Sequence, residues 1–119
     1  MKKILIIDDE KDILKNVSAI LTEEGYMCYE ALNSNDALNI YNSHKIDLIL
    51  LDVWLEDSEY DGIEILEIIR SENTVPIILM SGHGNIDMAV NAIKKGAQEF
   101  IEKPFSSERL LLSVDRTLE

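Results

Sequence analysis

Polar side chains that could take part in chemistry follow four short apolar runs of the sequence. They are the carboxylates Asp8, Asp9 and Asp52, the hydroxyl of Ser81 and the ammonium group of Lys103. Carboxylate oxygens are ligands that suit Mg²⁺, and a carboxylate can also act as a nucleophile that forms an aspartyl phosphate. A hydroxyl and a lysine beside it can hold phosphoryl oxygens. These residue types favour magnesium-dependent phosphoryl transfer, if the fold brings them to one place.

The apolar runs themselves are typical of buried β-strands. They cover residues 4–7, 27–31, 48–51, 77–80 and 100–101. The run at 48–51 does not alternate polar with apolar side chains, so both of its faces should be covered. That pattern predicts a parallel sheet with helices on both sides.

Between the strands lie segments with the apolar spacing of helices. The first helix should end at Gly25 and the fourth at Gly96, and the third should begin after Asp61, a good N-cap. The second should cover about residues 34–42, and the fifth should begin near residues 106–107. The side chains expected to face the core are Ile13, Leu14, Val17, Ile20, Leu21, Ala37, Leu38, Tyr41, Ile63, Leu66, Ile69, Met88, Ala89, Ala92, Ile93, Leu110, Leu111, Val114 and Leu118.

Five strand–helix units predict an α/β fold, a doubly wound five-stranded parallel sheet with right-handed crossovers. In such a sheet the binding site lies outside the carboxyl ends of the strands. The carboxylates, the hydroxyl and the lysine follow the first, third, fourth and fifth strands, whereas the second strand should be outermost and carries no comparable group. We therefore expect these side chains to meet at one edge of the sheet.

Length, charge and cysteine content narrow the classes of function. The chain has 119 residues, which fits one domain, and its net charge of −12 makes nucleic acid an unfavourable direct partner. No apolar run approaches the roughly 20 residues of a membrane-spanning helix, so we expect no membrane partner. The single cysteine, Cys28, cannot form an internal disulfide, which predicts a reducing cytoplasmic location.

The acidic pair, Asp52, Ser81 and the Lys103–Pro104 pair match the pattern of receiver domains of two-component response regulators. The sequence resembles that family over its whole length. The resemblance implies a CheY-like, flavodoxin-like fold with the strand order 2-1-3-4-5, in which residues 1–119 form one receiver domain. It also implies a signalling domain that assists its own phosphorylation and dephosphorylation rather than an enzyme.

The resemblance implies a phosphoacceptor and a metal site. Asp52 would accept the phosphoryl group. Asp8 and Asp9 would bind Mg²⁺, or Mn²⁺, together with Asp52 and the backbone carbonyl of Trp54.

The resemblance also implies the residues of a switch. Ser81 would be the switch hydroxyl, Lys103 the catalytic lysine of the family, and Phe100 the switch aromatic that turns inward on activation. The peptide bond before Pro104 is usually cis in the family. The rim of the site would be formed by Trp54, Gly82 and His83.

The implied partners are a sensor histidine kinase, which donates the phosphoryl group, and an output domain. Homodimerisation through the fourth helix, fifth strand and fifth helix is the expected response. The loop from Asp52 to Asp61 is longer than the usual receiver loop, and here the sequence is similar to NtrX-type and NtrC-type nitrogen regulators. In those proteins an ATPase domain and a DNA-binding domain follow the receiver. We therefore expect the chain to be the N-terminal part of a longer transcriptional regulator.

Three other functions could use similar residues or the same fold. A phosphatase of the haloacid-dehalogenase type also uses an aspartyl nucleophile with Mg²⁺, but it needs aspartates at i and i+2, and Asp8 is followed at that spacing by Glu10. A flavodoxin-like mononucleotide binder needs a glycine-rich phosphate loop where this chain has three acids. A degenerate receiver would serve only as a protein-binding module. The acidic segment 56–59 is expected to be a solvated loop.

Overall fold

The computed structural model describes residues 1–82 and 86–119, and within them five strands alternate with five helices. The strands are β1 (Lys3–Ile7), β2 (Met27–Ala31), β3 (Leu48–Asp52), β4 (Ile77–Ser81) and β5 (Glu99–Glu102). The helices are α1 (Lys11–Glu23), α2 (Ser34–Ser43), α3 (Gly62–Arg70), α4 (Ile86–Lys94) and α5 (Ser107–Leu118). Every strand and helix expected from the sequence is therefore present.

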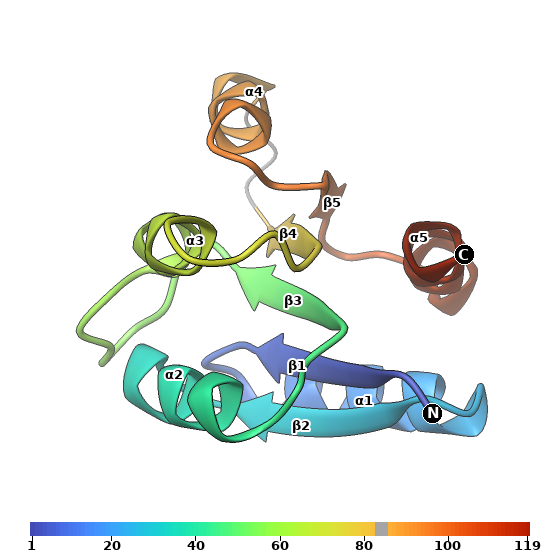
Figure 1. Cartoon of the computed structure of the whole chain (residues 1–119). Helices are drawn as coiled ribbons and strands as arrows, with labels where there is room; N and C mark the ends of the chain where they lie inside the picture. Colours follow the sequence, from blue (N-terminus) through green and yellow to red (C-terminus); the bar gives the residue numbers. More distant parts are fainter. Residues whose placement is uncertain (83–85) are drawn as a thin grey trace.

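The strands form one parallel sheet in the order β2-β1-β3-β4-β5 (Figure 1). This order confirms the predicted doubly wound α/β fold, with β2 at an outer edge. In the register of the sheet, Ile7 lies beside Leu51 and Asp52 lies beside Met80. The carboxyl ends of β1, β3 and β4 are thus level with one another, at the edge where ligands bind in sheets of this kind.

Two apolar layers cover the sheet. Side chains alternate along β1, so that Leu5 and Ile7 join the layer beneath α2, α3 and α4, while Ile4 and Ile6 join the layer beneath α1 and α5. Figure 1 shows α2 and α3 on one side of the sheet and α1 and α5 on the other. All residues of β3 and β4 are buried, as the runs without alternation predicted.

The loop between β3 and α3 closes at its base on a glycine. The Gly62 N–H donates to Val53 O at 2.8 Å. A Cβ at position 62 would lie 2.2 Å from the backbone oxygen of Asp52, so no larger residue fits there without moving the backbone. Asp61, directly before it, caps α3 in a reciprocal capping box with Glu64. The start of α3 is thereby fixed against the strand end that carries Asp52.

One core prediction was wrong. Ile93 on α4 was expected to face the core, but it is 46% exposed and lies near Val90, which is 47% exposed. Ala92 is the residue through which α4 packs on the core, and it is fully buried. Successive residues of a helix point about 100° apart, so the side chain of residue 93 turns partly outward. In the described ranges, none of the helices has the length and apolar content that a membrane span requires.

Candidate functional site

Three carboxylates meet at the carboxyl edge of the sheet. Asp52 is the last residue of β3, and Asp8 and Asp9 follow β1 directly. One oxygen from each of these three side chains lies within 4.8 Å of the others. Oxygen ligands at this spacing fit a hard divalent cation such as Mg²⁺, which takes a few carboxylates and keeps several waters.

Lys103 reaches into the same group from the end of β5. Its backbone N–H donates to Ser81 O at 2.8 Å, which extends the pairing of β4 and β5. Its Nζ lies 2.6 Å from Asp8 Oδ2 and 3.4 Å from Asp52 Oδ1. The ammonium group thus contacts two of the three carboxylates, and the ionised cluster carries two negative charges in excess. That excess is what a divalent cation would neutralise.

The two acids that follow β1 are held in different ways. Asp8 is fully buried, and while its Oδ2 accepts from Lys103 its Oδ1 accepts from the Glu10 N–H at 2.9 Å. Asp9 is half-buried, and its Oδ2 accepts from the Glu56 N–H at 2.9 Å. Hydrogen bonds to both oxygens therefore orient the Asp8 carboxylate, whereas a single hydrogen bond from the loop between β3 and α3 orients that of Asp9.

Burial and like charge make Asp52 a weak acid. Desolvation, followed by the charge of Asp8, raises the pKa of Asp52 to about 7, although Lys103 acts in the opposite direction. Burial would lower the pKa of Lys103, but its hydrogen bond to Asp8 and the charges of Asp52 and Asp8 outweigh that effect and raise it. Near neutral pH the cluster thus exchanges a proton at Asp52 while Lys103 stays charged.

The other residues expected at the site surround this cluster. Ser81 is the last residue of β4 and is fully buried, and Gly82 after it is exposed. Phe100 on β5 is half-buried and packs against the layer beneath α2, α3 and α4. Trp54 is 51% exposed. His83 lies outside the described residues.

A groove runs beside the cluster, and sequence reasoning missed it. Its lining includes Gly82, Lys103 and Pro104 on one side, and Ile13 and Val17 of α1 on the other. The peptide bond between Lys103 and Pro104 is cis. Nothing in the local sequence pairs α1 with the end of β5, because only the strand order brings the two together.

Segment 56–59 is a loop in which Glu56, Asp57 and Glu59 are exposed, as predicted, but it also makes specific contacts. Ser58 is half-buried and bonds to α2 and to the backbone of Tyr60. Glu56 contributes the N–H that binds Asp9. The three acids of this segment are solvated, whereas the serine hydroxyl among them makes contacts that the sequence did not indicate.

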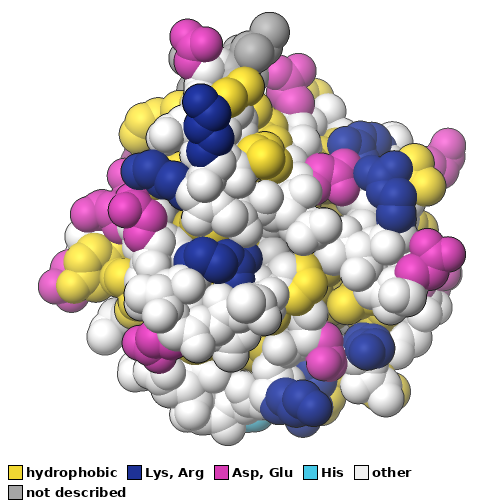
Figure 2. Space-filling view, turned by 45° about the horizontal axis from the view of Figure 1, so that its top comes forward, with side chains coloured by type: hydrophobic (Ala, Val, Ile, Leu, Met, Phe, Trp, Pro, Cys, Tyr) yellow, Lys and Arg dark blue, Asp and Glu magenta, His cyan; other side chains and the backbone are white. Residues whose placement is uncertain are grey.

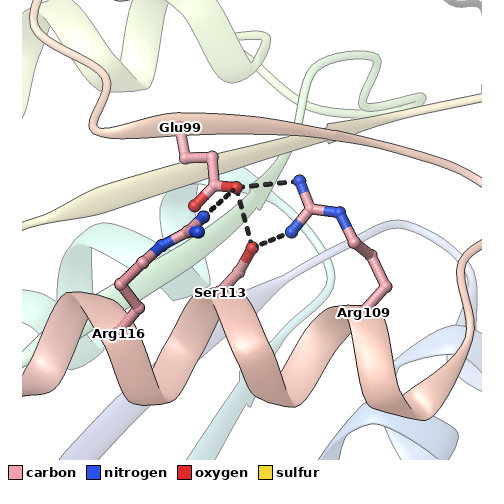
Figure 3. Close-up of polar contacts among 4 residues, drawn as sticks. All are labelled: Glu99, Arg109, Ser113 and Arg116. Carbon is pink, nitrogen blue, oxygen red and sulfur yellow. Dashed lines mark hydrogen bonds and ion pairs between the residues drawn. The ribbon is translucent and has the colours of Figure 1, made fainter.

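A second polar cluster joins α5 to β5, next to Phe100. Glu99 Oε1 accepts hydrogen bonds from Arg109, Ser113 and Arg116 (Figure 3). Burial alone would raise the pKa of Glu99, but the hydrogen bonds from these three side chains outweigh it and hold that pKa below its usual value. The cluster fixes the rotation of α5 against the strand that carries Phe100.

Surface charge is mixed on the face that Figure 2 shows. Lys and Arg side chains lie there among acidic ones, with no continuous basic patch. Hydrophobic side chains reach the surface in the upper part of the same view. This face does not have the strongly positive surface that binds a phosphate backbone.

Comparison with known proteins identifies related chains. The family model described as the response regulator receiver domain matches residues 4–115. The nitrogen assimilation regulatory protein NtrX of Azorhizobium caulinodans is 49% identical over 117 residues, which cover 98% of this chain and 26% of that protein. The DNA-binding transcriptional regulator NtrC of Proteus hauseri is 33% identical, over 95% of this chain and 24% of that protein. The chain thus spans about a quarter of the length of these relatives.

Solved structures of receiver domains superimpose closely on the chain. The receiver domain of NtrX from Brucella abortus superimposes with a TM-score of 0.92 at 43% identity, covering 97% of each chain. The beryllofluoride-activated NtrC4 receiver domain, solved as a dimer, gives a TM-score of 0.91 at 42% identity, covering 99% of this chain and 97% of that one.

Proposed function

Because the chain belongs to the response regulator receiver domain family, we propose that it accepts a phosphoryl group on Asp52 in a magnesium-dependent reaction. The observation that carries this proposal is the position of the Asp52 carboxylate. It lies at the carboxyl edge of the sheet, between two further carboxylates and the ammonium group of Lys103. Family membership supports a signalling domain of a two-component system, and the geometry supports this residue as its acceptor.

The transfer itself needs one bond to form and one to break. An Asp52 carboxylate oxygen attacks the phosphorus, and the bond from phosphorus to the leaving atom of the donor breaks. The leaving atom, an imidazole nitrogen of a histidine kinase or an acetate oxygen of acetyl phosphate, keeps the electron pair. Catalysis of such a transfer is mainly alignment and charge neutralisation, and Lys103 and the Ser81 hydroxyl are the proposed ligands of the phosphoryl oxygens.

The donor set fits a divalent cation. Asp8, Asp9 and Asp52 would hold Mg²⁺, or Mn²⁺ in its place, with the backbone carbonyl of Trp54 as a further ligand. When bound, the cation supplies positive charge beside the transferring group and lowers the repulsion among the carboxylates. The side chain of Trp54, with Gly82, would form the rim through which the donor enters.

Intact mass spectrometry after incubation with acetyl phosphate and Mg²⁺ tests the proposed function. A mass gain of one phosphoryl group is expected, and peptide mapping should locate it on Asp52. A chain that releases phosphate without a covalent adduct would instead support the phosphatase alternative. No mass gain, with Mg²⁺ binding shown separately, would support the degenerate receiver.

Trp54 should report on the metal site, because it is the only tryptophan and lies two residues after Asp52. The residue is 51% exposed, so its indole is open to solvent. We expect Mg²⁺ or beryllofluoride to change its fluorescence intensity in a saturable titration. A flat signal, with binding established by calorimetry, would place the indole away from the site.

A groove beside the cluster is the proposed approach for the phosphoryl donor. Apolar side chains of Ile13, Val17, Pro104 and Phe105 line it next to Lys103. A helix of a sensor histidine kinase could lay apolar side chains along this groove and bring its phosphohistidine to Asp52.

Phosphorylation is proposed to change the surface formed by α4, β5 and α5. In the active state Ser81 binds the phosphoryl group and Phe100 turns inward, as a shift between two populated states. Val90, Ile93 and Leu112 are already exposed apolar side chains on this surface. They fit a symmetric dimer, and the NtrC4 receiver dimer supports that assembly by likeness.

Dimerisation gives the third test. Sedimentation with beryllofluoride and Mg²⁺ should show about twice the monomer mass for the wild type, and Ser81→Ala should accept the phosphoryl group but dimerise weakly. Ile93→Ser should also remain monomeric, whereas Met27→Ser, at an exposed apolar residue on β2, should dimerise normally. All runs need matched ionic strength, because the acidic surface repels itself at low salt. Equal mass in both states would contradict the proposed switch and leave the phosphoacceptor untouched.

Likeness to transcriptional regulators supports a wider role. We propose that residues 1–119 are the N-terminal receiver of a longer regulator, in which phosphorylation controls a transcription-activating output domain. This domain would act in the cytoplasm and would bind no nucleic acid directly, in keeping with its net charge of −12.

A further inference from the structure

The loop between β3 and α3 is fastened to α2 by a ring of hydrogen bonds. The Ser34 N–H donates to Ser58 Oγ at 2.8 Å, and Ser58 Oγ donates to Tyr60 O at 2.8 Å. The Tyr60 N–H donates in turn to Ser34 Oγ at 3.1 Å. Ser34 is fully buried, and Ser58 and Tyr60 are half-buried. Hydrogen bonds shielded from water are costly to break, because the separated groups would be left without partners.

Apolar contacts and the base of the loop add to this attachment. Leu55 and Tyr60 pack against the core layer beneath α2, α3 and α4. At the base, Gly62 bonds to Val53 and permits a backbone approach that no side chain would allow. The loop is therefore held at its base by the sheet and at its middle by α2.

The part of the loop that is attached to α2 also contacts the Asp9 carboxylate of the acidic cluster. The Glu56 N–H donates to Asp9 Oδ2 at 2.9 Å, and Glu56 lies two residues before Ser58. A carboxylate has lone pairs on both oxygens, so this bond leaves Asp9 free to bind a cation through its other oxygen. An oriented ligand loses less conformational freedom when the cation binds, and groups that orient metal ligands raise metal affinity.

We propose that the Ser34–Ser58–Tyr60 ring positions Asp9 for Mg²⁺. The ring holds the loop against α2, the loop holds the Glu56 N–H on Asp9, and the oriented carboxylate binds the cation more tightly. Both serines are positioning residues, since they act through the loop and touch no ligand. The inference rests on the magnesium site of the proposed function and adds to it a determinant of affinity.

The test compares Ser34→Ala, Ser58→Ala and the double variant by Mg²⁺ calorimetry and by hydrogen exchange of the Glu56 amide. Each single variant should bind Mg²⁺ about 10-fold more weakly, the lower end of the effect of losing a group that orients a metal ligand, and should exchange faster at Glu56. The double variant should be little weaker than either single one, because the ring is already open. Ser43→Ala, at an exposed serine on the far end of α2, should bind Mg²⁺ as the wild type does.

Unchanged Mg²⁺ affinity in the single variants would overturn the inference, whether or not exchange at Glu56 had changed. Ser34 lies on α2 and Ser58 lies in the loop, so if one variant fails to fold the other still decides. A wild type that fails to bind Mg²⁺ would overturn the inference together with the metal site of the proposed function. Acetyl phosphate labelling of the same samples reports separately on Asp52 as the acceptor.

Discussion

Asp52→Asn is expected to lose all covalent labelling by acetyl phosphate while keeping the fold. The substitution replaces the nucleophilic oxygen with an amide that cannot form the acyl phosphate, and it changes side-chain volume very little. Intact mass spectrometry should show one added phosphoryl group on the wild type with Mg²⁺ and none on the variant. Chelation of the cation with EDTA should abolish labelling of the wild type as well, because the ionised cluster then repels the donor.

Asp57→Asn is the matched control for this experiment. It removes one negative charge from the neighbouring loop, at an exposed residue with a φ of 52° that asparagine adopts readily. Its labelling should equal that of the wild type. Labelling that persists in Asp52→Asn would move the nucleophile elsewhere, and Asp8 would be the first residue to substitute.

The fold could be predicted because its signals are local in the sequence. The run at 48–51 lacks polar alternation, and β3 is buried on both faces. Asp61 followed by an apolar helical stripe predicted the start of α3, where it forms the capping box. Each element carries its own pattern, and the rule that parallel strands need crossover helices leaves few arrangements for five such units.

The carboxylate cluster was predictable for a related reason. Strand ends in a parallel sheet share one edge, so Asp8, Asp52 and Lys103 could be assigned to one place before any distance was known. What the rule cannot supply is which atoms touch. The 2.6 Å contact from Lys103 to Asp8, closer than that to Asp52, depends on side-chain conformations in a buried space.

Contacts between distant side chains had no sequence signal. Ser34 and Ser58 are 24 residues apart, and neither lies in a motif that would pair them. The cluster of Glu99 with Arg109 and Arg116 likewise joins a strand to a helix whose rotation depends on packing. Ile93 was misplaced for the same reason, since apolar spacing indicates the inward side of a helix only to within a residue.

The burial of Asp52 has a consequence for stability. A carboxyl group whose folded pKa is about 7 holds its proton in the folded state over a pH range where the unfolded chain, near its ordinary value of 3.8, has lost it. The stabilisation of the folded state by protonated Asp52 is therefore fully present below pH 3.8, and it is lost as the pH rises towards 7. Lys103 and Glu99 do not make stability depend on pH near neutrality. The pKa of Lys103 is raised from 10.5 and that of Glu99 is lowered from 4.5, so both groups stay ionised there in the folded and the unfolded chain.

Asp52→Asn is accordingly expected to be more stable than the wild type in EDTA, and increasingly so as pH rises from 5.5 to 8. The difference in unfolding free energy should grow by about 1–2 kcal/mol over that range, since one pKa unit corresponds to about 1.4 kcal/mol. Urea denaturation of both proteins at matched ionic strength measures this difference, and Asp57→Asn is expected to differ from the wild type by an amount that is independent of pH.

Saturating Mg²⁺ should stabilise the wild type at pH 8 more than Asp52→Asn, because the cation binds the folded carboxylates and the variant lacks one of them. A wild type and Asp52→Asn with parallel pH profiles in EDTA would show that the buried carboxyl ionises without cost, and the crowding of Asp8 and Asp52 would then have no energetic effect.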